Sequence, residues 1–314
     1  MYFKHTSVLP KKILDFAPEK TQTILDCTIG SGGHSKKLLE KFPNAKLFGI
    51  DRDSRALKSS NYFLKPFEKN ITLKQANFSE LKECLDHWMN PFFDYVLADI
   101  GTSAEQLERP ERGFSFTHEG PLDMRMDPRR QQITAAFLVN YSSKNELLKI
   151  LRTYGEERFA SKIVNRILIE REKKPFKTTK DLAEIVKKTI PRKFQKPKLN
   201  PATLTFQAFR IAVNEELNEL SNLLELVPLI LKPNGRFSII SFHSLEDRII
   251  KRKFKIWESP CDCPKNMPYC ICGKKSLGEI ITKRPICASK KEKELNPRSR
   301  SANLRVFCYK NNGI

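Results

Sequence analysis

A glycine-rich turn, Asp26-Cys27-Thr28-Ile29-Gly30-Ser31-Gly32-Gly33-His34-Ser35, follows the first apolar run of the chain and leads into a helical pattern. Its glycines let the backbone approach a ligand closely, and the start of the helix offers free N–H groups. A dinucleotide-binding fingerprint would place its third glycine at position 35, where this chain has Ser35. Ser35 therefore weakens the case for a nicotinamide dinucleotide as the ligand. A tight turn that binds no ligand is the alternative.

Strand-like runs and helical patterns alternate around this turn. The helical patterns separate short, β-branched apolar runs at 23–28, 46–51, 71–75 and 95–100. Helical spacing occurs between them at 35–41, 54–64 and 79–86. This alternation predicts an α/β fold with a doubly wound parallel sheet and right-handed crossovers.

The alternation stops after residue 105, and helical spacing at 146–151 and 157–170 predicts a helical insert over 106–205. A helix over 206–230, a Pro233-Asn234-Gly235 turn and a strand over 236–242 then return the chain to the sheet. Later runs at 278–282 and 304–309 are expected to add edge strands. The sheet domain is thus expected to be discontinuous, built from 1–105 and 206–314.

Polar side chains end the predicted strands, where ligands of open α/β sheets bind. Asp51 ends the second strand, at the spacing from the turn where a carboxylate takes the two hydroxyls of an adenosine ribose. After the third strand, Phe78 is placed to border a purine, with core packing as the alternative. Asn77 and Asp99 are further candidates for polar contacts, and an unpaired buried carboxylate such as Asp99 would be costly.

The positive charge is concentrated in two segments. The chain of 314 residues has a formal net charge of +21, of which +11 lies in 251–314 and +8 in 156–199. Two basic surfaces suit one phosphate-rich partner, with general solubility as the alternative explanation. No apolar run is long enough to span a membrane and no secretion signal is evident, so the cytoplasm is the expected location.

Four of the eight cysteines are crowded into one short segment: Cys261, Cys263, Cys270 and Cys272. Without a secretion signal, these are expected to be reduced thiols rather than a disulfide framework. Four thiolates can hold a structural zinc ion, although C-x-C pairs are less common than C-x2-C pairs. A reduced, loosely ordered loop is the alternative.

The ordered motifs of the chain closely resemble the bacterial 16S ribosomal RNA (cytosine-N4)-methyltransferase family, called MraW or RsmH. Blocks in order are far more specific than any single motif. The matching blocks are His5-Thr6-Ser7-Val8-Leu9, the glycine-rich turn, Gly49-Ile50-Asp51-Arg52-Asp53, Asp99-Ile100-Gly101, Arg112-Gly113-Phe114-Ser115-Phe116, Gly120 to Asp127, Tyr154 to Arg158, Pro201-Ala202-Thr203, Phe206 to Ile211, Ser241 to Arg248 and Asn296 to Ser301.

The resemblance implies a class I methyltransferase domain with an inserted helical domain and S-adenosylmethionine as cofactor. It implies no catalytic metal. The residues that would line the cofactor site are Gly30, Gly32, Gly33, His34, Asp51, Phe78, Asp99 and Gln106. Two departures from the family pattern are Ala104, where a hydroxyl is usual, and Leu204, where an arginine is usual.

The implied reaction is methylation of the exocyclic N4 of a cytidine at the decoding-centre P site of 16S rRNA, within the small ribosomal subunit. Because the N4 lone pair is delocalised into the ring, the amine must be oriented and must lose a proton. Asp99 is the first candidate for orienting the amine. His243 is the second candidate, as a proton relay. For His243 the alternative is that it orients the loop that follows.

Base and phosphate contacts are expected on two sets of residues. The first set, in the insert, would contact the target base, with core packing as the alternative for its two phenylalanines: Phe114, Phe116, Asp123, Arg125 and Asp127. The second set would bind phosphates, with a solvated surface as the alternative: Arg298, Arg300, Arg305, Lys251, Arg252 and Lys253.

Other functions fit the sequence less well. Ser35 argues against a nicotinamide oxidoreductase, and the segment Asp99-Ile100-Gly101-Thr102 lacks the Pro-Pro-aromatic motif of DNA amine methyltransferases. A noncatalytic RNA-binding module would not need Asp51. The sequence leaves the oligomeric state open, with a homodimer as one alternative.

Overall fold

The computed structural model describes residues 7–195, 200–264, 267 and 269–310. His5 and Thr6 of the first family block therefore lie outside the described residues. The chain forms two compact units, one from Met1–Gly101 with Leu217–Ile314 and the other from Thr102–Glu216.

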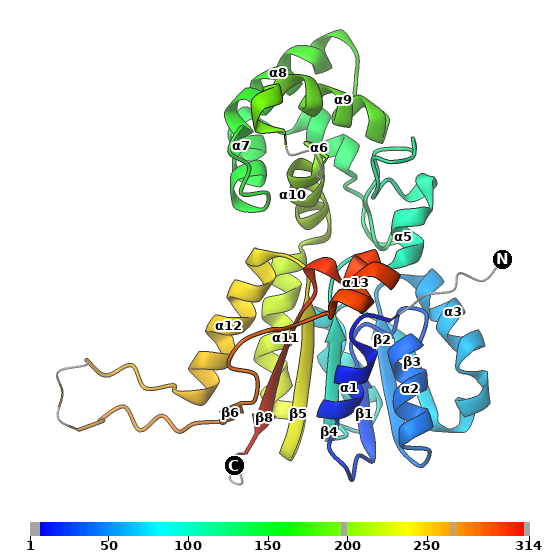
Figure 1. The fold of residues 1–314 in the computed structure, drawn as a ribbon, viewed down its shortest axis with the longest axis vertical. Helices are drawn as coiled ribbons and strands as arrows, with labels where there is room; N and C mark the ends of the chain where they lie inside the picture. Colours follow the sequence, from blue (N-terminus) through cyan, green and yellow to red (C-terminus); the bar gives the residue numbers. More distant parts are fainter. Residues whose placement is uncertain (1–6, 196–199, 265–266, 268, 311–314) are drawn as a thin grey trace. The chain divides into compact units, whose positions relative to one another are not determined.

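The first unit is built on an eight-stranded sheet (Figure 1). Five neighbouring strands are parallel, as predicted. In sheet order these are β3 (Ile71–Gln75), β2 (Lys46–Asp51), β1 (Thr23–Asp26), β4 (Phe93–Asp99) and β5 (Leu231–Ser241). The order continues with β8 (Asn303–Tyr309) and β6 (Gly278–Ile280), and β7 (Ile286–Cys287) also pairs with β8.

Strand β8 corrects the expectation that 304–309 would form an edge strand. It lies between β5 and β6 and runs antiparallel to both. Its residues from Leu304 to Tyr309 are buried, which suits an interior strand covered on both faces. The sequence pattern identified the strand correctly but not its place in the sheet.

The two faces of this sheet carry separate apolar clusters because successive side chains of a strand point to opposite sides. In β4, Val96 and Ala98 join the cluster beneath α4, α11 and α12. Tyr95 and Leu97 join the cluster beneath α1 and α2. The helices of this unit are α1 (Pro10–Phe16), α2 (Gly33–Lys41), α3 (Ser54–Phe63), α4 (Leu81–His87), α11 (Glu216–Ile230), α12 (Ser244–Glu258) and α13 (Lys290–Leu295).

The second unit is helical, and its described residues contain no β-strand longer than one isolated bridge. Its helices pack around one apolar cluster that includes Ile163, Val164 and Ile167, which the helical spacing had placed on one face. Its α-helices are α5 (Ala104–Glu108), α6 (Ala135–Tyr141), α7 (Lys144–Thr153), α8 (Ala160–Lys173), α9 (Thr179–Thr189) and α10 (Thr203–Asn214).

The predicted single helix over 206–230 is wrong, because the chain breaks at Glu215. There φ is +50°, the left-handed region, and α10 ends just before it while α11 begins just after it. The buried side chain of Asn214 donates to the Met124 carbonyl at 2.8 Å and accepts from the Met126 N–H at 2.9 Å. These bonds fix α10 within the second unit, so the boundaries fall at Gly101 and Glu216 rather than at 105 and 205.

Candidate functional site

Three carboxylates end neighbouring parallel strands. Asp26 ends β1, Asp51 ends β2 and Asp99 ends β4. Because β2, β1 and β4 are adjacent and parallel, their carboxyl ends meet at one edge of the sheet. The glycine-rich turn follows β1 at this edge, which is where open α/β sheets bind ligands.

The turn itself depends on two glycines in the left-handed region. Gly30 has φ +52° and Gly32 has φ +87°, a conformation that residues with a Cβ adopt at a cost. A Cβ at Gly32 would also come within 3.0 Å of the Leu64 side chain. Gly33 and His34 form the first residues of α2. The positive φ values explain why glycine stands at positions 30 and 32, and the close approach of a ligand to this backbone stays a prediction.

Asp51 links the turn to the end of β2. Its Oδ2 accepts from the Gly30 N–H at 2.9 Å and its Oδ1 accepts from the Asp53 N–H at 2.8 Å. Burial raises the pKa of Asp51 to about 7, against the lowering effect of these two bonds. Each carboxylate oxygen accepts one of these bonds and retains capacity to accept another, so the group can also receive a pair of hydroxyls.

The turn is also held by hydrogen bonds among Asp26, Thr28 and Ser35. The sequence analysis did not predict these roles. The Ser35 hydroxyl donates to Asp26 Oδ2 at 2.6 Å, and the Thr28 N–H donates to Asp26 Oδ1 at 3.1 Å. The Thr28 hydroxyl accepts from the Asp99 N–H at 2.6 Å. Burial raises the pKa of Asp26. The available signal was Ser35 itself, a hydroxyl at the position of the missing glycine, facing an acid at the end of the first strand.

His34 and Asp99 bring unsatisfied polar atoms to this edge. The distance from His34 Nε2 to Asp99 Oδ2 is 3.4 Å, and the two side chains are 8% and 16% exposed. Within the described part of the chain, neither ring nitrogen of His34 nor Oδ1 of Asp99 has a hydrogen-bond partner. Buried polar atoms without partners are costly and uncommon, so these atoms point to a polar ligand at this edge.

Phe78 lies shortly after the end of β3 and is partly buried. Its ring packs against the cluster on the α11 face, and its N–H donates to Asn77 Oδ1 at 3.0 Å. The next residue, Ser79, is fixed by Glu219 of α11, which accepts from the Ser79 N–H at 2.8 Å. Asn77 therefore shapes the backbone of this turn while Phe78 lies beside it.

Gln106 belongs to the second unit. It is buried, and its Oε1 accepts from the Ser103 N–H at 3.0 Å while Ser103 Oγ accepts from the Gln106 N–H at 3.2 Å. This reciprocal pair caps α5. The neighbouring Ala104 is the first residue of α5, where its missing hydroxyl is not needed for the cap.

His243 is the N-cap of α12. Its Nδ1 accepts from the Glu246 N–H at 3.4 Å, and its Nε2 lies 3.1 Å from Glu246 Oε1. Glu246 Oε2 accepts from the Phe242 N–H at 2.8 Å. These contacts match the alternative that His243 orients the segment between β5 and α12.

In the insert, the residues predicted to contact the target base make contacts with other residues of the insert. Phe114 is 6% exposed and belongs to the core, while Phe116 makes an edge-to-face contact with Phe206 at a centroid distance of 5.2 Å. Arg125 forms a two-pronged pair with Asp123, at 2.8 and 2.7 Å. Asp127 is buried and accepts from the Arg129 N–H at 3.3 Å. Core packing, the alternative left open for the phenylalanines, describes Phe114 in this structure.

The candidate phosphate binders fall into two groups. Arg300, Lys251 and Arg252 are exposed, and Arg298 is partly exposed. Arg305 differs, because it is 5% exposed and its guanidinium makes two bonds with Asp247 at 2.7 and 2.9 Å. Its positive charge is therefore paired with Asp247 inside the sheet domain. The expectation that Arg305 binds phosphate is wrong. Lys253 pairs with Glu225 at 2.5 Å.

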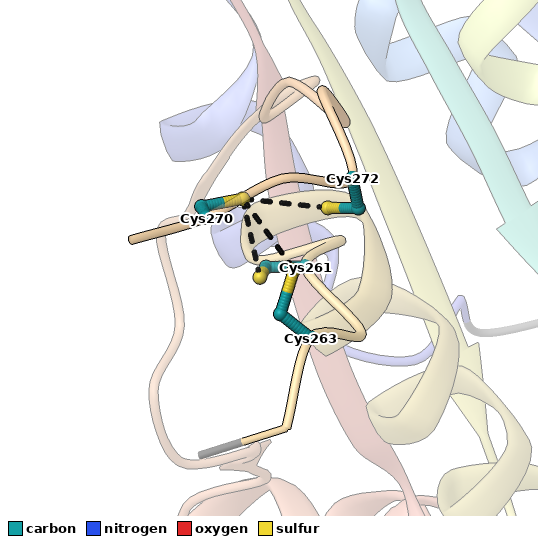
Figure 2. Close-up of side chains that lie close together, drawn as sticks. All are labelled: Cys261, Cys263, Cys270 and Cys272. Atoms are coloured by element: carbon teal, nitrogen blue, oxygen red, sulfur yellow. Dashed lines mark hydrogen bonds between the residues drawn. The ribbon is translucent and has the colours of Figure 1, made fainter. Parts of the chain in front are cut away.

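The four crowded cysteines converge in the loop between α12 and β6 (Figure 2). All four Sγ atoms lie within 4.8 Å of one another. They are exposed or partly exposed, and none is in a disulfide. The four residues of the possible zinc site thus lie close together, and the zinc ion itself stays a prediction.

The fold and the carboxyl edge define a class of protein. A sheet ordered β3-β2-β1-β4-β5 with an antiparallel strand inserted before the last one, a glycine-rich turn after β1 and an acid ending β2 are the features of a class I methyltransferase. None of the described helices is long and apolar enough to cross a membrane.

The chain belongs to the MraW methylase family, whose sequence profile matches residues 2–310. Relatives named "Ribosomal RNA small subunit methyltransferase H" include one from Symbiobacterium thermophilum, 44% identical, covering 98% of this chain and 96% of the relative. Another, from Clostridium botulinum, is 46% identical and covers 99% and 100%. Among solved structures, a putative rRNA methylase from Clostridium thermocellum gives a TM-score of 0.42 at 10% identity, covering 98% of this chain and 100% of that one.

Proposed function

We propose that this protein transfers a methyl group from S-adenosylmethionine to the 16S rRNA of the small ribosomal subunit. The relatives that match nearly the whole chain carry the name of a small-subunit rRNA methyltransferase. The observation that carries the proposal within the molecule is the edge formed by Asp51, His34 and Asp99, with its unpartnered buried atoms. The finer target is the N4 of a cytidine at the decoding-centre P site.

The residues present fit this cofactor. Asp51, already fixed by two backbone N–H groups, has acceptor capacity for the ribose diol. Phe78, partly exposed beside the end of β3, supplies an apolar surface for the adenine. For the charged methionine end, His34 offers a ring nitrogen and Asp99 its Oδ2, which leaves Asp99 Oδ1 for the substrate. When bound, the cofactor supplies an electrophilic methyl group on a sulfonium.

Recognition of RNA would draw on the two basic segments. Lys251, Arg252 and Arg300 are exposed and lie in the segment that carries a net charge of +11. Such residues neutralise phosphates without reading sequence, so they set affinity and its salt dependence. A substrate in the small ribosomal subunit also agrees with the expected cytoplasmic location.

For transfer to N4, the chain must orient a weakly nucleophilic amine. Asp99 is the group proposed to do so: its Oδ1 has no partner among the described residues and can accept an N–H of the amine. Accepting this hydrogen bond localises the nitrogen lone pair toward the methyl group, and alignment supplies much of the rate. His243 caps α12 through Nδ1 and is proposed to position the β5–α12 segment. Its buried Nε2 has no hydrogen-bond partner among the described residues, so His243 stays the second candidate for a proton relay.

The test is an assay of the product. The protein is incubated with labelled S-adenosylmethionine and small ribosomal subunits that lack the modification, and the rRNA is digested to nucleosides. We expect label in N4-methylcytidine, lost in Asp51→Ala and retained in Asp86→Ala, a matched change of an exposed acid on α4. Label in another nucleoside would overturn the N4 target, and no label despite cofactor binding would overturn the rRNA substrate.

A further inference from the structure

The cysteine cluster has the dimensions of a metal site rather than of a disulfide pair. Cys270 Sγ lies 3.5 Å from Cys261 Sγ, 3.9 Å from Cys263 Sγ and 3.4 Å from Cys272 Sγ (Figure 2). A tetrahedral zinc with Zn–S bonds of about 2.3 Å separates its sulfur atoms by about 3.8 Å. A disulfide instead joins one sulfur to one other at about 2.0 Å. A four-ligand site needs four sulfur atoms at similar distances from one another, and all four Sγ atoms here lie within 4.8 Å of one another.

Among its described residues, the loop that carries the cysteines has no apolar core of its own. Its large apolar side chains face solvent: Tyr269 is 81% exposed, Ile271 73% and Met267 40%. In Figure 1 the described parts of the segment between α12 and β6 extend away from the sheet. Segments that cannot bury enough apolar surface need a cross-link to hold one conformation, and a structural metal is a common one.

Both ends of the loop are anchored to the sheet domain, so a cross-link between its two arms would close it. The Leu277 N–H donates to the Trp257 carbonyl at 2.8 Å, and the Ile280 N–H donates to Glu258 Oε1 at 2.8 Å. Farther out, Lys274 pairs with Asp262 at 2.5 Å, which joins the same two arms as the cysteines do. Cys261 and Cys263 lie on the outgoing arm, while Cys270 and Cys272 lie on the returning arm.

We propose that Cys261, Cys263, Cys270 and Cys272 bind one zinc ion as thiolates and thereby close this loop. Binding releases four protons to solvent and changes no oxidation state, and the complex of four thiolates with Zn²⁺ carries a charge of −2 by simple addition. Lys274, already beside Asp262, and the exposed Lys275 supply nearby positive charge. With all four positions taken by protein, the ion has a structural role and no open site for substrate.

The proposal is tested on the full chain, purified without chelator under reducing conditions. Elemental analysis is expected to find about one zinc per chain, falling about tenfold or more in Cys261→Ser/Cys263→Ser. Cys287→Ser is the matched control, because Cys287 is exposed and lies outside the cluster. It should retain the metal. Replacement of zinc by Co²⁺ should give the visible absorption of a tetrahedral thiolate site in the wild type and not in the double variant.

A second measurement separates loss of metal from loss of fold. Limited proteolysis of the wild type should show faster cleavage within 259–276 after zinc is removed by a chelator, with unchanged circular dichroism. Any of three results would overturn the proposal: iron in place of zinc, two disulfides in the alkylated protein, or equal zinc in the wild type and the double variant. The test does not depend on methyl transfer, so it stands or fails separately from the proposed function.

Discussion

The glycine-rich turn and the cysteine loop place polar groups for a ligand in opposite ways. At the turn, buried strand ends and the Asp26–Ser35 bond fix the side chains before any ligand arrives. In the loop, the residues around the four thiols are exposed, and the two arms meet only at the thiols and at the Asp262–Lys274 pair among the described contacts between them. A ligand at the turn would therefore fill a site already formed, whereas a metal in the loop would help to form its own site.

The largest effect is expected from Asp51→Ala. If the turn is a preformed site, losing this carboxylate should weaken cofactor binding on the order of 100-fold, because two hydrogen bonds to a charged acceptor are lost. Calorimetric titration with S-adenosylhomocysteine measures it, with Asp86→Ala as the control. Zinc content should not change, since the loop is a separate site. Equal affinity in both variants would remove Asp51 from the cofactor site.

The pH dependence should reveal the same carboxylate. The pKa of Asp51 is about 7 in the folded protein against 3.8 ordinarily, so between these values the folded state binds the extra proton. The contribution of Asp51 to the stability of the ligand-free protein therefore decreases as pH rises from 4 toward 7. Cofactor affinity should move oppositely and fall about tenfold per unit below pH 7, because protonation removes an acceptor.

Comparison of wild type with Asp51→Asn isolates this contribution. Chemical unfolding across the same pH range should show a smaller decrease of stability with pH in the variant, which carries no titrating group at this position. The same pH slope for both proteins would contradict the assignment of the raised pKa to Asp51.

Ser35→Gly tests which interaction holds the turn in place before a ligand binds. The change completes the G-x-G-x-x-G spacing but removes the hydroxyl that donates to Asp26. We expect a loss of about 1–3 kcal/mol of stability, from a buried acceptor left without its partner, and no gain of NADH binding. Thermal unfolding is the measurement, and Ser221→Gly on the exposed face of α11 controls for the helix propensity of glycine. Equal losses in both variants would mean that the Asp26 bond contributes nothing.

The smallest effect is expected on RNA binding by basic residues of the sheet domain. Lys251 and Arg252 lie on α12, which leads into the cysteine loop, and Arg300 lies in the last basic segment. Replacing all three by alanine should reduce the salt slope of ribosomal-subunit binding by about 1 per lost phosphate contact. Filter binding over a salt series measures this slope, while cofactor affinity should stay unchanged. An unaltered slope would place the phosphate contacts elsewhere.

Much of the sheet domain could be predicted because its signals are local. β2 and β3 have the predicted bounds, and Asp51 lies at the carboxyl edge, since an apolar run followed by an acid fixes both the strand and its end. The place of β8 could not be predicted, because nothing in a strand's own sequence says which strands it will pair with. The break at Glu215 was missed for a related reason: it is stabilised by Asn214 bonding to a loop far away in sequence.

The candidate site shows the same limit. Residue type and spacing predicted Asp51 and Asp99, and the family resemblance added His34. The bonds from Ser35 to Asp26 and from the Asp99 N–H to Thr28 need the three-dimensional structure. Arg305 is the clearest failure. Within a basic segment it resembled its neighbours, yet its side chain turns inward to Asp247 because β8 is an interior strand.

The interior position of β8 also sets the order in which the molecule can be completed during its own synthesis. A ribosome makes β1 to β5 first, and β5 then has one edge without a partner until β8 emerges much later in the chain. An open strand edge is a template for wrong pairing with other nascent chains. Translation speed between β5 and β8, and chaperones that cover that edge, would therefore control how much of the newly made protein reaches this fold.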